Sequence, residues 1–150
     1  MLTDDEKYLD ELEGDDDEDE FEELDDEIKE YLATANKIME DNKEYIELFK
    51  KDLVEANLTK KTIRRHAGNV NLFTNYYLAD QLFTIKDGPY QLEGFFERKS
   101  MCPTAAEIKA IAASLKKFYK SMLKHEKIDQ ETYDYFYNQI KNNLDIWMVF

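Results

Sequence analysis

Residues 103–123 are PTAAEIKAIAASLKKFYKSML, and this stretch predicts a long amphipathic helix. Thr104 and Glu107 have the spacing of a capping box, and Pro103 stands directly before them. Apolar side chains then recur at steps of three and four residues, as on the buried face of a helix: Ile108, Ile111, Ala112, Leu115, Phe118, Tyr119, Met122 and Leu123. The chain therefore contains at least one strongly specified helix.

Other segments show the same periodicity. Apolar residues recur between Leu24 and Met39 and again from Tyr45 to Leu53, which allows two helices or one kinked helix. Thr59 is a suitable cap for a helix over about 60–79, YQLEGFFERK (90–99) predicts a short helix, and Asp129 caps a last one. No segment alternates with period two over a useful length. The sequence predicts an all-α fold, a compact bundle of five or six helices formed by residues 24–150 as a single domain.

Negative charge is concentrated at the start of the chain. Residues 1–30 carry 18 of the 34 acidic side chains and two lysines, a net charge of −16, whereas residues 31–150 sum to +2. Blocks of like charge bury too little apolar surface to offset chain entropy. Residues 1–23 are therefore predicted to form a disordered acidic arm. The arm could mimic DNA and cover a basic surface, or it could be a solvated tail.

Two of the predicted helices carry basic side chains on one side. At about 100° per residue, helix 60–79 gathers Lys60, Lys61, Arg64, Gly68, Asn71 and Asn75, with Arg65 just beyond them. The helix that starts at Thr104 gathers Lys109, Lys116, Lys117, Lys120, Lys124 and Lys127. Lysine and arginine neutralise phosphates, and asparagine can contact an adenine edge. Lysine is also common on solvated helix faces, but two one-sided helices together favour a DNA-binding surface.

A family resemblance supports this interpretation. YIELFKKDLVEANLTKKTIRRHAGNVNLFTNYYL (45–78) is similar to the opening of the N-terminal core-binding, SAM-like domain of tyrosine recombinases, or phage integrases. TAAEIKAIAASLKKFYKSMLKHEKI (104–128) resembles a later helix of that domain. The resemblance covers residues 45–128 and is loose over 81–96. It implies a helical bundle that faces DNA and nominates these contacts by position: Lys60, Lys61, Arg64, Arg65, Lys116, Lys117, Lys120 and Lys124.

The sequence departs from the recombinase pattern where catalysis is concerned. Only 22 residues follow Ile128, too few for the catalytic domain of that family. Neither His66 nor His125 is followed by an arginine three positions later. Strand transfer is therefore not expected, and the resemblance concerns DNA binding alone.

Other kinds of site find little support in the sequence. The single cysteine, Cys102, excludes an intramolecular disulfide and a multi-cysteine zinc site. A calcium loop starting at Asp15 would place Glu20 where glycine is needed and Asp26 where glutamate is needed. No catalytic constellation and no phosphate-binding loop is present, so we expect no enzyme activity, no cofactor and no metal.

The start of the chain lacks the features of a signal peptide, and no apolar run reaches about 20 residues. A cytoplasmic protein without membrane contact is expected.

Two functions remain open at this point. The first is a non-catalytic, weakly DNA-binding domain of the recombinase core-binding type, with duplex DNA as partner and a regulatory acidic arm. The alternative is a protein-interaction adaptor that uses the same bundle, with the arm recruiting a basic protein. The net charge of only +2 over residues 31–150 supports the alternative, because DNA-binding domains are usually strongly basic.

Overall fold

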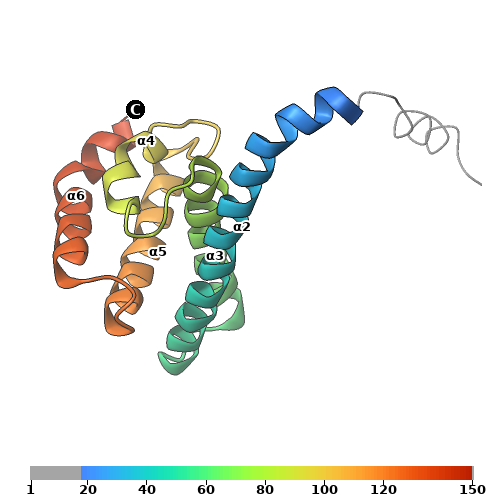
Figure 1. Cartoon of the computed structure of the whole chain (residues 1–150). Helices are drawn as coiled ribbons and strands as arrows, with labels where there is room; N and C mark the ends of the chain where they lie inside the picture. The colour runs from blue at the N-terminus through green and yellow to red at the C-terminus, as the bar shows by residue number, and fades with distance from the viewer. Residues whose placement is uncertain (1–17, 150) are drawn as a thin grey trace, which may run out of the picture. The chain divides into compact units, whose positions relative to one another are not determined.

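The computed structural model describes the backbone of residues 18–149 and the side chains of residues 25–149. Within that range every regular element is a helix (Figure 1), which confirms the predicted all-α fold. In chain order the elements are α2 (Glu18–Glu55), α3 (Lys60–Asn71), the π-helical segment η1 (Leu72–Leu78), the short 3₁₀ segments η2 (Ala79–Gln81) and η3 (Gly88–Gln91), α4 (Leu92–Phe96), α5 (Ala105–Lys124) and α6 (Gln130–Val149).

Residues 18–55 form one uninterrupted helix, α2, so the first of the two sequence alternatives, a pair of helices, is wrong. The helix begins six residues before the predicted boundary at residue 24. The rest of the predicted arm, residues 1–17, lies outside the described residues. The chain divides into two compact units, Met1–Thr34 and Ala35–Phe150, and the helical bundle belongs to the second.

Within the second unit, α5 lies between α3 and α6 (Figure 1). Its apolar face is the one predicted from the sequence, and Phe118 and Tyr119 are fully buried on it. The part of α2 that belongs to this unit contacts α5 through Phe49, whose ring meets Phe118 edge-on at 5.5 Å between centroids. The capped helix 104–124 is therefore the centre of the bundle.

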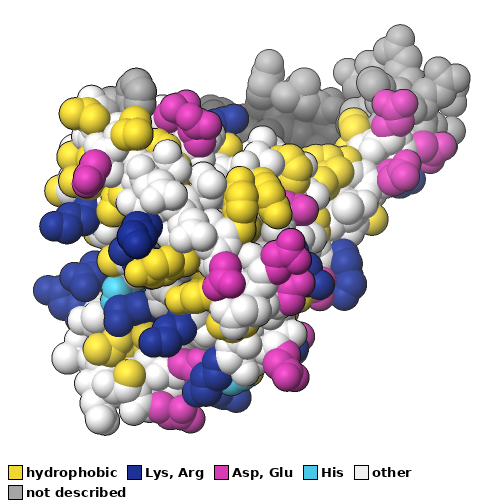
Figure 2. Space-filling model, turned by 90° about the vertical axis from the view of Figure 1, so that its left-hand side faces the viewer, with side chains coloured by type: hydrophobic (Ala, Val, Ile, Leu, Met, Phe, Trp, Pro, Cys, Tyr) yellow, Lys and Arg dark blue, Asp and Glu magenta, His cyan; other side chains and the backbone are white. Residues whose placement is uncertain are grey.

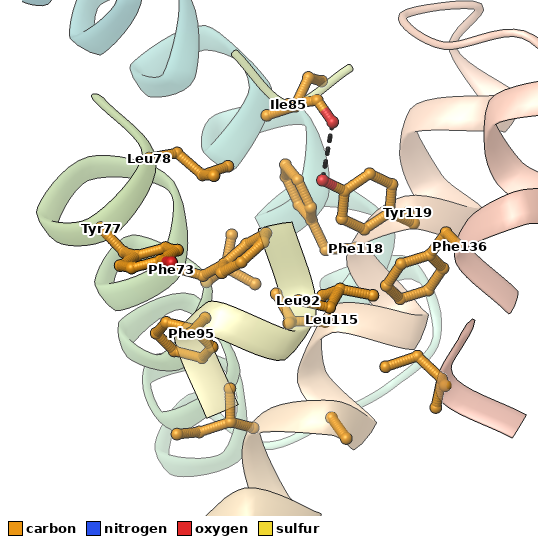
Figure 3. Packing of buried hydrophobic residues seen from close by; sticks show 14 of the residues in the cluster. Phe73, Tyr77, Leu78, Ile85, Leu92, Phe95, Leu115, Phe118, Tyr119 and Phe136 are labelled. Atoms are coloured by element: carbon orange, nitrogen blue, oxygen red, sulfur yellow. Dashed lines mark hydrogen bonds between the residues drawn. The ribbon is translucent and has the colours of Figure 1, made fainter. Parts of the chain in front are cut away.

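The core is rich in aromatic rings (Figure 3). Phe73 and Tyr77 of η1 surround Phe95 of α4, at 4.9 and 5.2 Å between ring centroids. On the other side, Tyr119 stacks on Phe136 of α6 at 4.2 Å. The Tyr119 hydroxyl donates a 2.7 Å hydrogen bond to the backbone carbonyl of Ile85, so its polar atom is satisfied inside the core. Short segments between α3 and α5 thus contribute several of the largest core side chains.

Three of the helices, α3, α5 and α6, start where the sequence predicts. The side chains of Thr59, Thr104 and Asp129 each accept a hydrogen bond from the backbone N–H three residues later, at 3.2, 3.1 and 2.8 Å. Each bond satisfies one of the N–H groups that a helix leaves without a backbone partner at its start. All three predicted caps are confirmed.

The helix ends follow a pattern that the sequence conceals. Asn57, Leu82 and Glu126 have positive φ angles of 63°, 63° and 59°. In each case the next N–H bonds to the carbonyl five residues back, at 3.2, 2.9 and 2.8 Å, which closes the helical turn. Glycine usually occupies such left-handed positions because it has no Cβ. Since none of the three is glycine, the usual signal for a helix end is absent.

The predicted helix 60–79 is helical throughout but changes its winding after Asn71. In η1 the Thr74 hydroxyl donates to the Val70 carbonyl at 2.8 Å, and the N–H of Ala79 reaches the carbonyl of Thr74, five residues back. A side-chain hydroxyl that bonds to the helix backbone can widen or bend the turn. The wider turn carries Phe73 and Tyr77 on the buried side of the segment.

Candidate nucleic-acid interface

The first two turns of α3 carry four cations and no acid. Lys60, Lys61, Arg64 and Arg65 are all exposed, and none pairs with a carboxylate of the described residues. Cations near a helix N-terminus oppose the helix dipole, which favours negative charge there. The helix dipole therefore does not explain why four cations lie here, and all four are open to solvent.

A second row of cations runs along α5. Lys109, Lys116, Lys117 and Lys120 are exposed, and none of them has an ion-pair partner within the part of the chain that the structure describes. Three of them lie in the second half of the helix. We group the cations of α3 with these three lysines under the name basic face, which comprises Lys60, Lys61, Arg64, Arg65, Lys116, Lys117 and Lys120.

One serine joins the two rows. Ser114 of α5 is buried, and its Oγ lies 2.7 Å from Nδ1 of His66 and accepts a 3.0 Å hydrogen bond from Nδ2 of Asn69, both on α3. The same hydroxyl lies 3.2 Å from the carbonyl of Ala110 and donates to it. These bonds hold α3 and α5 in a fixed relation at the level of the basic face.

The pKa of His66 is affected by cations of both rows. Burial lowers its pKa, and the charges of Arg65 on α3 and Lys117 on α5 lower it further. The two cations therefore act on the same imidazole from different helices. Figure 2 shows lysine and arginine side chains gathered around a histidine on the left of the face that it draws. The structure thus brings predicted residues from both helices together.

The two asparagines predicted to contact DNA bases are used inside the protein. Nδ2 of Asn42, a buried residue of α2, donates to Oδ1 of Asn75 at 2.8 Å and to the carbonyl of Thr74 at 3.2 Å. Nδ2 of Asn75 in turn donates to Oδ1 of Asn71 at 2.6 Å. Reading an adenine edge would require breaking this amide chain, so we leave Asn71 and Asn75 out of the basic face.

Lys124 differs from the other lysines of α5 because carboxylates of α2 engage it. Its Nζ lies 3.3 Å from Oδ1 of Asp52 and 3.9 Å from Oε2 of Glu55. Asp52 also accepts hydrogen bonds from Ser121 at 2.6 Å and from His125 Nε2 at 3.0 Å. The predicted contact Lys124 is therefore part of a polar cluster that fastens α2 to the end of α5, and its charge is partly neutralised there.

The Asp52 cluster predicts an acid-sensitive contribution to stability. Burial raises the pKa of Asp52, but the hydrogen bonds from Ser121, His125 and Lys124 outweigh this and leave it below its usual value. A carboxylate with a lowered pKa stabilises the fold above its unfolded-state pKa, near 4, and this contribution is lost as the pH falls through the folded-state pKa. We expect Asp52→Asn to reduce the free energy of unfolding by about 1–2 kcal/mol at pH 7.

The difference between Asp52→Asn and the parent chain should shrink below about pH 4. Urea unfolding of both chains at pH 7 and pH 3 measures it. Glu55→Gln is the matched control, because Glu55 is exposed and reaches Lys124 only at 3.9 Å. An equal loss for Asp52→Asn at both pH values would contradict the assignment.

Cys102 is fully buried, and burial raises the pKa of its thiol to about 11, so the thiolate is scarce at neutral pH. Among the described residues no three histidine, cysteine or acidic side chains are grouped as metal ligands. None of the described helices is long and apolar enough to cross a membrane.

Comparisons with protein-family models, with curated proteins and with solved structures find no match to this chain. The interpretation of the basic face therefore depends on its own geometry.

Sequence reasoning found the cations but missed the residues that organise them. Ser114 lies among apolar positions of α5, and only its place opposite α3 gives it a role. Asp52 falls on the buried side of an acidic helix, where its sequence spacing resembles that of solvated acids. For Ser114, a polar residue among apolar positions of a helical pattern was the available signal, whereas the spacing of Asp52 gave none.

Proposed function

We propose that the protein is a non-catalytic DNA-binding domain that contacts duplex phosphates through the basic face. The observation that carries this proposal is the set of seven exposed cations on two neighbouring helices, with no carboxylate partner in the described chain. Phosphate contacts of this kind supply most of the affinity in non-specific binding. The resemblance to the recombinase core-binding domain supports the same surface.

The binding is expected to be weak and to depend little on sequence. Residues 35–150 have a net charge of only +2, and the acidic residues at the start of the chain repel a polyanion. The asparagines that could have contacted base edges are hydrogen-bonded to each other. The acidic N-terminal region would tune access of DNA by competing for the cations of the basic face.

A salt series tests the proposal. Fluorescence anisotropy with a labelled duplex, from low to physiological salt, should show an affinity that falls with a log–log slope of about −3 to −6, because each neutralised phosphate contributes about −0.9. Uncharged interactions would give a slope near zero. Absence of binding even at low salt would refute the proposal.

A second candidate, a protein-interaction adaptor, is favoured by exposed apolar side chains on the acidic helix α2, including Ile28 and Leu32. Deletion of residues 1–23 separates the two candidates, because it removes 14 acidic side chains and Lys7. DNA binding through the basic face should become several-fold tighter without this charge. An adaptor that recruits a basic protein through residues 1–23 should instead lose its partner, whereas one that uses Ile28 and Leu32 should keep it without any gain in DNA affinity. Unchanged DNA affinity after the deletion would contradict a regulatory arm.

A further inference from the structure

The first half of α2 carries apolar side chains that remain open to solvent. Ile28 is 49% exposed and Leu32 is 48% exposed, and both belong to the unit that ends at Thr34. Isolated exposed apolar residues are ordinary on protein surfaces. These two are one helical turn apart, however, and therefore form a single patch on one side of the helix.

The patch continues a pattern that is buried elsewhere on the same helix. At about 100° per residue, Ile28 has the helical sequence spacing that Ala35, Ile46 and Leu53 share. These three residues are buried in the bundle. Leu24 continues the spacing in the sequence toward the N-terminus. The apolar spacing of residues 24–34 is thus the same kind of spacing that is buried in the bundle farther along the sequence.

The surroundings of the patch are acidic on both sides. Asp25 lies about 60° to one side of Ile28 and Glu27 about 100° to the other at the helical repeat. Residues 18–34 contain nine acidic side chains and one base, Lys29, whose Nζ pairs with Asp25 at 2.7 Å. Two such helices would repel each other, because like charges would meet along both rims. Charge therefore disfavours a second copy of α2 as the occupant.

From these observations we infer that residues 25–34 of α2 are a docking surface for a basic amphipathic helix of another protein. The apolar side chains of that helix would cover Ile28 and Leu32, and its lysines or arginines would pair with the acidic rims. Helix-to-helix recognition of this kind uses anchors spaced three and four residues apart. The inference is independent of DNA binding and gives the adaptor candidate a defined surface.

Binding of designed peptides to the full-length chain tests the inference. The probe is a labelled 18-residue peptide of leucine and lysine with leucines at steps of three and four, and a scrambled peptide of identical composition is its reference. We expect the patterned peptide to bind at least tenfold more tightly, because only it presents its leucines on one face. Equal binding of the two peptides would show attraction by charge alone and would overturn the inference.

Variants of the protein locate the peptide. Ile28→Ser with Leu32→Ser should abolish the preference for the patterned peptide. The matched control, Val54→Ser with Ile146→Ser, removes two other exposed apolar side chains and should keep it. Circular dichroism checks that helix content is unchanged. A preference that survives Ile28→Ser with Leu32→Ser would refute the docking surface.

Self-association is the competing outcome. If sedimentation velocity of the peptide-free chain shows a dimer that Ile28→Ser with Leu32→Ser dissolves, the occupant is a second copy and the basic partner is wrong. Charge reversal on the basic face should leave peptide binding unchanged. Failure of this inference is thereby distinguishable from failure of DNA binding.

Discussion

A chain carrying Lys61→Glu, Arg64→Glu, Lys117→Glu and Lys120→Glu is expected to bind duplex DNA at least about 100-fold more weakly than the parent at low salt. All four side chains are exposed, so their replacement leaves the core intact. The change turns four attractive contacts into four repulsive ones on two helices at once. Anisotropy with the same labelled duplex, at one fixed salt concentration, measures the loss.

A control with equal charge separates the basic face from net charge. Lys43→Glu, Lys86→Glu, Lys99→Glu and Lys141→Glu also reverse four exposed lysines, but none of them lies on α3 or α5. We expect this chain to lose several-fold at most, through the general increase in negative charge. If both chains lose affinity equally, the cations of α3 and α5 have no special role, and the proposed interface is wrong.

The substitution Gly88→Ala is expected to lower the free energy of unfolding by about 2–4 kcal/mol, because a single methyl group overpacks the core and displaces a buried hydrogen bond. A Cβ at this position would collide with the Tyr119 hydroxyl and would lie 3.1 Å from Phe73 and 3.2 Å from Leu78. Tyr119 cannot retreat easily, since it is fully buried and stacks on Phe136. Gly88 has a negative φ, so backbone strain does not contribute. Chemical denaturation measures the change.

The Tyr119→Phe background tests the cause. Removing the hydroxyl should cost about 1 kcal/mol alone, through its lost bond to Ile85. Because it also makes room for the methyl group, Gly88→Ala should cost less in this background than in the parent. Gly68→Ala is the matched control in open space: an added Cβ would meet no heavy atom within 4 Å beyond its neighbouring residues and the local helix backbone, and helix propensity should raise stability by about 0.5–1 kcal/mol. Strict additivity of Gly88→Ala and Tyr119→Phe would contradict the steric explanation.

The fold was largely predictable because capping residues mark the starts of its helices and apolar periodicity marks their buried faces. Thr59, Thr104 and Asp129 are caps by residue type alone, and the apolar stripe of α5 has a single interpretation. The helix ends were less visible, because Asn57, Leu82 and Glu126 take left-handed conformations without glycine. Such conformations depend on the tertiary packing that surrounds them. The apolar spacing breaks at EDNK (40–43), yet α2 continues through it. Tertiary packing explains this too, because Asn42 is buried and hydrogen-bonded to η1.

For the candidate site, the sequence predicted which helices carry cations but not which of these cations pair with carboxylates. Lys116 and Lys124 are alike in the sequence, yet only Lys124 meets the carboxylates of Asp52 and Glu55, which are about 70 residues away in the chain. Asn71 and Asn75 were predicted as base contacts because they share a helix side with Lys61. The structure shows that the same side meets Asn42 of α2. Partners distant in the sequence decide both cases, and helical periodicity contains no information about them.

The hydroxyl of Ser114 has a consequence for the kind of polyanion that could bind. Because one atom bonds to His66 and Asn69 of α3 from within α5, the two rows of cations are held at a set separation. The separation of the two helices sets the separation of the two rows of cations. The basic face matches a ligand whose phosphates repeat at that separation, and it gains little from one whose charges are spaced differently. If the basic face binds duplex DNA as proposed, duplexes of different groove width should therefore be bound with different affinity.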